Sequence, residues 1–189
     1  IGADPVELER TLTGTRRFVY VAKEVSPQLW KEVENLNLSG ILSESASRRV
    51  YPQGALAANV IGFINSDGIG RGGIEYSFNK DLAGTPGRAV FTMAGGATRI
   101  RTGSQDIVQP TPGASVRLTI DRDVQWIAQR AIADRVKYAR ADFGMVTVLD
   151  TTNGHIVAMA VAPSFNPNDV RKTDPALLGN RAVSNVFEP

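Results

Sequence analysis

Residues 115–163 constrain the fold of this 189-residue chain more than any other stretch. Apolar residues recur at helical spacing over residues 124–136, after Asp121, a residue type that caps helices by accepting a backbone N–H. The spacing predicts one amphipathic helix that ends near Ala141, and a short apolar run predicts a strand over residues 116–120, directly before it.

Two β-rich runs follow, residues 143–150 and 155–161. They are joined by Thr151-Thr152-Asn153-Gly154, in which Asn-Gly supplies the positive φ that a tight hairpin turn requires. Both runs carry apolar residues on both faces, which is typical of strands covered on two sides. The pattern therefore predicts that this hairpin is the inner part of an α/β sandwich.

Composition excludes several classes of function. Hydrophobic content of 42% and charged content of 21% are ordinary for a soluble folded protein, and no apolar run approaches the roughly 20 residues of a membrane helix. The formal charge of +2 gives nucleic-acid binding little support. Absence of cysteine excludes disulfides and thiolate chemistry, and a single histidine argues against a His-based metal cluster or a Ser-His-Asp triad. Because the chain opens with Ile1 and not with an initiator Met, the sequence leaves open whether a membrane anchor lies upstream.

The first 110 residues alternate between helical and extended patterns. Helices are predicted over residues 5–12, from Pro27 to a point before Gly40, and over residues 74–82, with a short helix or turn at residues 56–64. Strands are predicted over residues 18–25, 41–51 and 88–93, with a hairpin turn at Gly95-Gly96. Asp4 and Ser26 are the predicted caps of the first two helices. Pro110-Thr111-Pro112-Gly113 is a stiff linker candidate, and the predicted domain boundary lies there. After Pro163 the pattern is loop-like until a short helical piece at residues 175–186.

Gly68-x-Gly70-x-x-Gly73 formally matches the dinucleotide-binding fingerprint, and a predicted helix follows it. A true site needs a buried strand immediately before the motif and an acidic residue about 20 residues further on. Here the preceding segment is the polar Asn65-Ser66-Asp67, so a flexible turn is the favoured interpretation. A nucleotide-dependent enzyme is the third-ranked hypothesis, to be tested by a thermal shift with NAD or ATP.

Two other features resemble catalytic groups but have simpler explanations. Asp121 and Asp123 could form an acid–base pair, although a helix cap and a first-turn carboxylate account for both. His155 begins a strand with no second histidine or cysteine beside it in the sequence. We therefore predict no catalytic residue, no cofactor site and no metal site in this chain.

Several short strings, in one order, are similar to the class B penicillin-binding proteins. They are Arg49-Val50-Tyr51-Pro52 with Ile61-Gly62; Gly73-Ile74-Glu75 with Leu82-Ala83-Gly84 and Gly87-Arg88; Leu118-Thr119-Ile120-Asp121 with Gln125; Leu149-Asp150 with Gly154 and Ile156-Val157-Ala158-Met159; Pro163-Ser164-Phe165-Asn166-Pro167; and Asn180-Arg181-Ala182-Val183 with Phe187-Glu188-Pro189. The first 47 residues carry little of this resemblance.

The resemblance implies an α+β chain of two parts. Residues 1–112 would form the elongated pedestal (dimerisation-like) domain, and residues 113–189 the start of the transpeptidase domain, an antiparallel sheet with helices on both faces. In the family, Phe187-Glu188-Pro189 is normally continued by Gly-Ser-x-x-Lys, whose serine attacks the stem peptide and is acylated by β-lactams. This chain would then be a scaffold that lacks the nucleophile.

The resemblance also implies a cellular setting. The parent protein would be a peptidoglycan D,D-transpeptidase without a metal or organic cofactor, held at the extracytoplasmic side of the bacterial membrane by an upstream transmembrane helix. The alternative hypothesis is a non-catalytic module that docks on other cell-wall synthesis or division proteins. For such docking, the loop at residues 68–73 and the Arg99/Arg101 hairpin are the exposed candidates.

Overall fold

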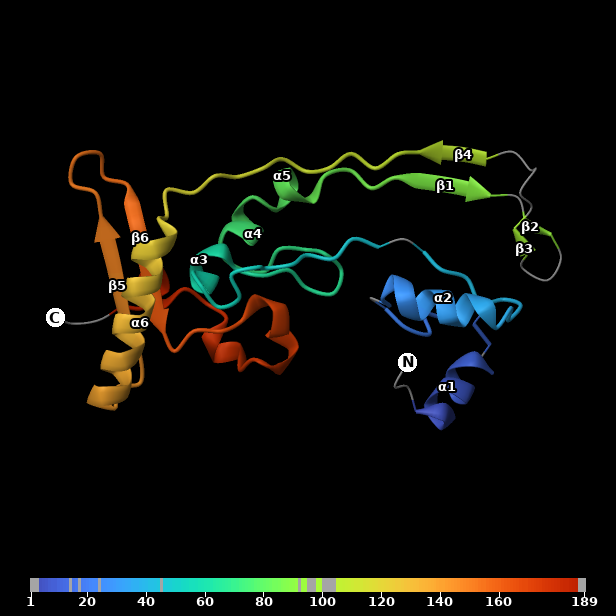
Figure 1. Ribbon diagram of the computed structural model, residues 1–189, viewed down its shortest axis with the longest axis horizontal. Helices are drawn as coiled ribbons and strands as arrows, with labels where there is room; N and C mark the ends of the chain where they lie inside the picture. Colours follow the sequence, from blue (N-terminus) through green and yellow to red (C-terminus); the bar gives the residue numbers. More distant parts are fainter. Residues whose placement is uncertain are drawn as a thin grey trace. The chain divides into compact units, whose positions relative to one another are not determined.

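The computed structural model describes residues 4–13, 15–16, 18–23, 25–44, 46–91, 93–94, 98–99 and 105–186. These residues form a mixture of helices and short antiparallel strand pairs, which agrees with the predicted α+β class (Figure 1). Contacts divide the chain into two compact units, Ile1–Arg48 with Ala89–Ile107, and Arg49–Arg88 with Val108–Pro189. All the buried apolar residues among those described belong to the second unit.

The first unit contains two capped helices, as predicted. The carboxylate of Asp4 accepts the Val6 N–H at 2.9 Å at the start of α1 (Pro5–Leu12). The Ser26 hydroxyl accepts the Leu29 N–H at 3.2 Å at the start of α2 (Pro27–Asn35). Neither helix has a buried residue, so local capping rather than core packing defines their ends.

Short strands lie wholly or mostly in the first unit. Strand β1 (Arg88–Phe91) pairs with β4 (Gln105–Val108), and β2 (Met93–Ala94) pairs antiparallel with β3 (Thr98–Arg99). The strand predicted at residues 88–93 is thus confirmed over its first four residues. The predicted turn at Gly95-Gly96 and the side chains of the Arg99/Arg101 hairpin lie outside the described residues.

Two predicted strands of the first half are wrong. Within the described parts of residues 18–25 and 41–51 the chain is not β-structure. Phe18 and Tyr20, which are 66% and 57% exposed, pack on each other with ring centroids 5.0 Å apart instead of on a neighbouring strand. A β-rich composition forms a strand only where a partner supplies the ladder hydrogen bonds.

The second unit begins with three short helices, α3 (Ala58–Ile61), α4 (Gly73–Ser77) and α5 (Asn79–Ala83). The α3 helix falls within the predicted range 56–64. The single helix predicted at residues 74–82 is instead two helices, which extend one residue beyond that range at each end and are interrupted at Phe78, whose backbone (φ −108°, ψ 22°) is not helical. An isolated bridge between Ile64 and Gly70 closes the loop between α3 and α4.

Backbone hydrogen bonds hold the segment Pro110-Thr111-Pro112-Gly113 at Thr111 and directly after Gly113. Thr85 and Thr111 exchange two backbone hydrogen bonds, both of 2.9 Å. One residue beyond the segment, the Ala114 N–H donates to the Asp81 carbonyl at 2.7 Å. These bonds tie the predicted linker to α5 and to the turn that follows it.

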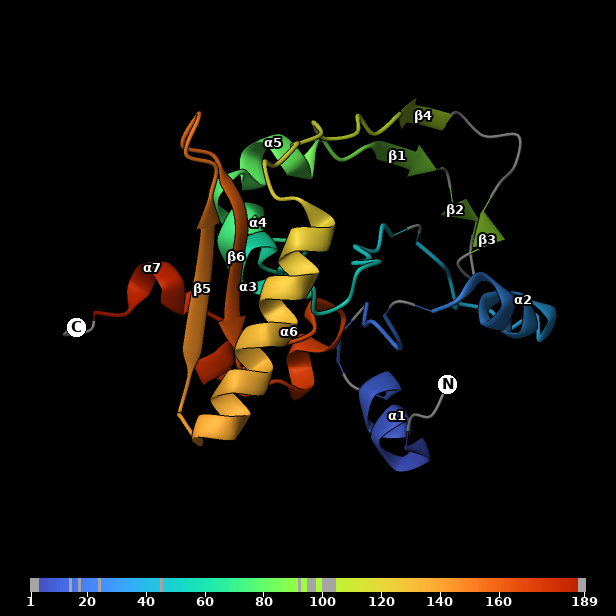
Figure 2. The same cartoon turned by 60° about the vertical axis from the view of Figure 1, so that its left-hand side comes forward.

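The α6 helix (Arg122–Ala139) and the hairpin of β5 (Gly144–Leu149) and β6 (Ile156–Ala162) form the helix–hairpin, in which α6 lies along one face of the strands (Figures 1 and 2). The Asp121 carboxylate accepts two N–H groups, from Asp123 and Val124, both at 2.9 Å. The core between helix and strands contains Ala128, Ala158 and Ala160. Small side chains allow α6 to approach the sheet closely, and the predicted helix and hairpin are confirmed.

The hairpin connection differs in detail from the prediction. In the loop between the strands Gly154 has positive φ (74°), whereas Asn153 does not. The Asn153 amide instead donates to the Asp150 carboxylate at 2.8 Å. Hydrogen bonds from the Thr152 hydroxyl and backbone lower the pKa of Asp150 below its usual value.

Residues 116–120 do not form the predicted strand. The Thr119 hydroxyl donates to the Ile156 carbonyl of β6 at 2.7 Å, and the next residue after the segment, Asp121, donates its N–H to the Val157 carbonyl at 2.8 Å. The next outward-facing residue of β6, Met159, pairs instead with a side chain of α6, as described below.

Short helical turns follow β6: two 3-10 turns, Pro167–Lys172 and Pro175–Leu177, and then α7 (Arg181–Ser184). The predicted helical piece at residues 175–186 is therefore divided in two. The α7 helix contacts the hairpin face opposite α6, where the Arg181 guanidinium lies 5.1 Å from the centroid of the Phe143 ring (Figure 2). Among the described helices, none combines the length and apolar character needed to cross a membrane.

Candidate functional site

Six polar residues of the second unit, four of them from its first half (residues 49–88), form what we call the polar junction. They are Arg49, Tyr51, Asn59, Glu75, Ser164 and Asn168. All six lie in the strings that carry the family resemblance or close beside them. The junction therefore gives these strings a shared structural role.

A partly buried ion pair lies at one end of the junction. The Arg49 Nε is 3.0 Å from Glu75 Oε1, and its Nη2 donates to Glu75 Oε2 at 3.2 Å, so the guanidinium binds both carboxylate oxygens. The Glu75 side chain is 8% exposed and that of Arg49 is 37% exposed. A bidentate pair of this kind fixes the orientation of both side chains, and it connects the extended segment at Arg49 to α4.

Tyr51 extends this network. Its hydroxyl donates to Glu75 Oε1 at 3.3 Å, and burial, followed by the negative charge of Glu75, raises the pKa of Tyr51 to about 12. Its backbone N–H donates to Asn168 Oδ1 at 3.0 Å, and its carbonyl accepts from Asn168 Nδ2 at 2.9 Å. The amide of Asn168 thus takes the place of a neighbouring strand at Tyr51, in the segment where the sequence predicted one.

Asn59 lies at the other end of the junction. This α3 residue is 6% exposed, accepts from the Ser164 hydroxyl at 2.7 Å and donates to the Gly179 carbonyl at 2.6 Å. An apolar cluster beside it contains Ala58, Phe63 and Phe165, and the two phenylalanine rings meet edge to face with centroids 5.9 Å apart. Polar and apolar contacts together fix α3 against the segments that follow β6.

A second set of amides joins the helix–hairpin to residues 55–57. Gln125 Nε2 donates to the Met159 carbonyl at 3.0 Å and Gln125 Oε1 accepts the Met159 N–H at 2.8 Å. One turn later, Gln129 donates to the Ala55 carbonyl at 2.8 Å and accepts the Ala57 N–H at 3.0 Å. Both glutamines lie on α6, so a single helix contacts the strands and the early segment.

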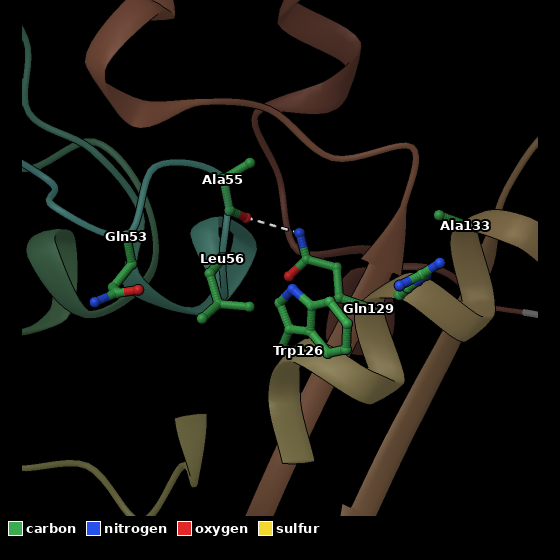
Figure 3. Close-up of a pocket in the computed structure, with 7 residues that line it drawn as sticks. Gln53, Ala55, Leu56, Trp126, Gln129 and Ala133 are labelled. Carbon is green, nitrogen blue, oxygen red and sulfur yellow. Dashed lines mark hydrogen bonds between the residues drawn. The ribbon is translucent and has the colours of Figure 1, made fainter. Parts of the chain in front are cut away.

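A shallow pocket of about 350 Å³ lies beside these amides, between α6 and residues 53–56 (Figure 3). Trp126, which is 53% exposed, and Leu56 are among the residues that line it, and the Arg130 guanidinium lies 5.4 Å from the centroid of the Trp126 rings. Gln129 faces the pocket but is already bonded to Ala55. The arrangement contains no group poised for acid–base or nucleophilic chemistry among the lining residues.

The glycines of the fingerprint-like loop are needed for close backbone packing. A Cβ on Gly70 would meet the Glu75 carbonyl, and one on Gly73, which has φ of +52°, would meet the Val60 carbonyl. The Gly70 N–H donates to the Asn79 side chain at 2.7 Å. Two of the three motif glycines are thus required by the packing of α4, which supports the turn interpretation over a phosphate site.

The other sequence candidates do not converge. Asp121 caps α6, Asp123 pairs only with its exposed neighbour Arg122 at 3.3 Å, and His155 is exposed at the start of β6. Among the described residues, no three His, Cys, Asp or Glu side chains are grouped as a metal site would require. Sequence patterns did not reveal the roles of Glu75, Asn59 and Asn168, whose partners lie far away in the chain.

The sequence matches the family described as "Penicillin-binding Protein dimerisation domain" over residues 6–118. This chain belongs to that penicillin-binding protein family. It is 35% identical to the peptidoglycan D,D-transpeptidase FtsI of Escherichia coli K12, over 92% of the chain and 29% of the relative. The chain spans about 30% of the length of the curated relatives it matches.

Solved structures of penicillin-binding proteins share this fold. A peptidoglycan synthetase from Bifidobacterium adolescentis is 32% identical and superposes with a TM-score of 0.65, over 100% of this chain and 34% of that one. Penicillin-binding protein 3 of Mycobacterium tuberculosis, complexed with aztreonam, is 34% identical with a TM-score of 0.59, over 75% of this chain and 28% of that one.

Proposed function

We propose that this chain is the scaffold part of a class B penicillin-binding protein, a D,D-transpeptidase that cross-links peptidoglycan stem peptides through a serine acyl-enzyme. The relatives support this proposal, since they include peptidoglycan D,D-transpeptidases and a solved protein that carries the β-lactam aztreonam. The parent protein acts without a metal or organic cofactor, on the extracytoplasmic side of the bacterial membrane, to which an upstream helix anchors it.

Within that protein, residues 1–112 form the pedestal and residues 113–189 open the transpeptidase domain. The family match over residues 6–118 supports this division because it ends close to the proposed boundary. The positions of α6 and α7 on opposite faces of the β5–β6 hairpin support an α/β sandwich with these two strands inside it. The chain contributes no catalytic residue.

The polar junction is the observation that supports the scaffold role. It links residues 49–75, in the pedestal, to residues 164–179, in the transpeptidase part, through the ion pair and side-chain hydrogen bonds described above. Buried polar groups with complete partners specify one arrangement of the segments they connect. The pedestal thereby orients the opening segment of the catalytic domain, and its remaining surface is available to other cell-wall synthesis or division proteins.

A fluorescent β-lactam tests this function. We expect covalent labelling of the complete parent protein, detected by denaturing gel electrophoresis, and none of this chain alone. Labelling of the chain alone would contradict the scaffold role, because the nucleophile would then lie within these residues. A complete protein that takes up no label would contradict the transpeptidase assignment.

A further inference from the structure

Asn59 contacts the segment that leads into α7. Its Nδ2 donates to the Gly179 carbonyl at 2.6 Å, and the Leu177 carbonyl lies at 3.4 Å from the same nitrogen. Its Oδ1 accepts from the Ser164 hydroxyl at 2.7 Å. The amide is 6% exposed and has partners for both of its ends, so its position is fixed.

The structure continues directly from Gly179 into α7. The next residue, Asn180, caps α7 by accepting the Ala182 N–H at 3.2 Å, and its side-chain nitrogen lies 3.3 Å from the Met159 sulfur. Arg181 then covers the Phe143 ring. The start of α7 is thus attached to the pedestal through Asn59 and to the hairpin through Asn180 and Arg181.

We infer that Asn59 is a positioning residue for the acylation reaction: it fixes residues 177–184, and through them the path of the chain into the reacting serine. This inference rests on the proposed function, in which the serine follows shortly after residue 189. Asn59 does not touch the substrate. Its effect should appear in the rate of the chemical step, because a displaced nucleophile reacts more slowly even when the ligand is bound.

The test uses Asn59→Asp and Asn59→Ala in the complete parent protein. Both remove the donor to Gly179, and Asn59→Ala does so without adding a buried charge. We expect the first-order acylation rate at saturating fluorescent β-lactam to fall about tenfold or more, with the non-covalent dissociation constant changed less than about twofold. Amide exchange at Val183 and Ser184 should accelerate about tenfold, while that of central α6 amides stays unchanged.

Asn37→Asp is the matched control. The Asn37 amide also donates to a backbone carbonyl, that of Asn35 at 3.3 Å, but it is exposed and lies in the first unit. This variant should match the parent protein in every measurement. Near-ultraviolet circular dichroism at low temperature identifies conditions in which each variant is folded, and Asn59→Ala decides the question if Asn59→Asp does not fold.

Two outcomes would overturn the inference: unchanged exchange at Val183 and Ser184, or an unchanged acylation rate, in a folded Asn59→Ala protein. Failure of the proposed function has a different signature, since the unsubstituted complete protein would then take up no label. The exchange measurement on the same proteins would still show whether Asn59 holds α7.

Discussion

The helix–hairpin and the polar junction are held together by different kinds of contact. In the helix–hairpin, fully buried alanines such as Ala158 and Ala160 let α6 lie close to the strands. In the junction, a carboxylate and two side-chain amides join segments that are far apart in the chain. The first arrangement depends on side-chain volume, and the second on individual donor and acceptor atoms.

The two regions nevertheless share one device, a side-chain amide that replaces a strand. Gln125 bonds both the N–H and the carbonyl of Met159, and Asn168 does the same for Tyr51. An amide presents one donor and one acceptor at the spacing of a peptide group, so it can satisfy an extended backbone residue. The comparison predicts how each region responds to substitution.

The largest effect is expected from Glu75→Ala. This change leaves Arg49 without its partner and the Tyr51 hydroxyl without its acceptor, so the free energy of unfolding should fall by about 3 kcal/mol. Urea unfolding measures the loss. The control is Asp123→Ala, which removes the exposed pair with Arg122 and should cost at most about 0.5 kcal/mol. Equal losses in the two variants would show that the junction contributes no more than surface charge.

Ala158→Leu tests the volume dependence of the helix–hairpin. Ala158 is 0% exposed and packs beneath α6, so a larger side chain must displace the helix, and we expect a loss of about 2 kcal/mol in thermal unfolding. Thr147→Leu places the same side chain at an exposed position of β5 and should change stability by less than about 0.5 kcal/mol. Tolerance of leucine at Ala158 would mean that this core is not tightly packed.

Asp121→Ala removes the cap of α6. The two N–H groups of Asp123 and Val124 lose their acceptor, which should lower the free energy of unfolding by about 1 kcal/mol. Asp121→Ser retains an acceptor and should recover most of this loss in the same urea titration. Equal destabilisation by alanine and serine would indicate that the carboxylate acts by something other than capping.

Tyr51→Phe should have the smallest effect at pH 7, below about 1 kcal/mol, because only one hydrogen bond to Glu75 is lost. At high pH the stability difference between Tyr51→Phe and the unsubstituted protein changes sign, within a defined pH window. The folded protein retains the Tyr51 proton more tightly than the unfolded chain, since the pKa is raised from 10.0 to about 12. Its contribution is therefore complete below pH 10 and is lost as pH rises from 10 to about 12.

Urea unfolding between pH 9 and pH 12 measures this contribution. Tyr51→Phe should flatten the decline in stability over that window. Tyr138→Phe, at a position that is 79% exposed, should leave the decline unchanged. A Tyr51→Phe protein with the original pH profile would show that the Tyr51 hydroxyl and Glu75 are not coupled in solution.

Local patterns predicted the parts of the fold whose contacts are near in sequence. The spacing of Val124, Ile132 and their neighbours predicted α6, and Asp121 predicted its start, because a helix forms from residues within a few positions of one another. The hairpin followed from two β-rich runs and a glycine between them. The same reasoning failed at residues 18–25 and 41–51, since a strand also needs a partner that composition does not reveal.

The polar junction could not be predicted from the sequence, for a related reason. Glu75 is 26 residues from Arg49, and Asn168 is 117 residues from Tyr51. Nothing in the sequence near Glu75 or Asn168 indicates burial, because a carboxylate and an amide are ordinarily found at the surface. The only indication was indirect: the strings that carry the family resemblance include or adjoin all six junction residues. Their joint occurrence could have suggested that they meet in space.

The Gln125 amide also has a consequence for how the small sheet can grow. By occupying the outward-facing N–H and carbonyl of Met159, it blocks the free side of β6 against pairing with another molecule, which protects against aggregation. A newly arriving strand can be added beside β5 without breaking a bond that the described residues make, whereas at β6 it would first have to displace Gln125. Extension of the sheet is thus directed to one side by Gln125, together with the Asp121 N–H that is bonded to the Val157 carbonyl.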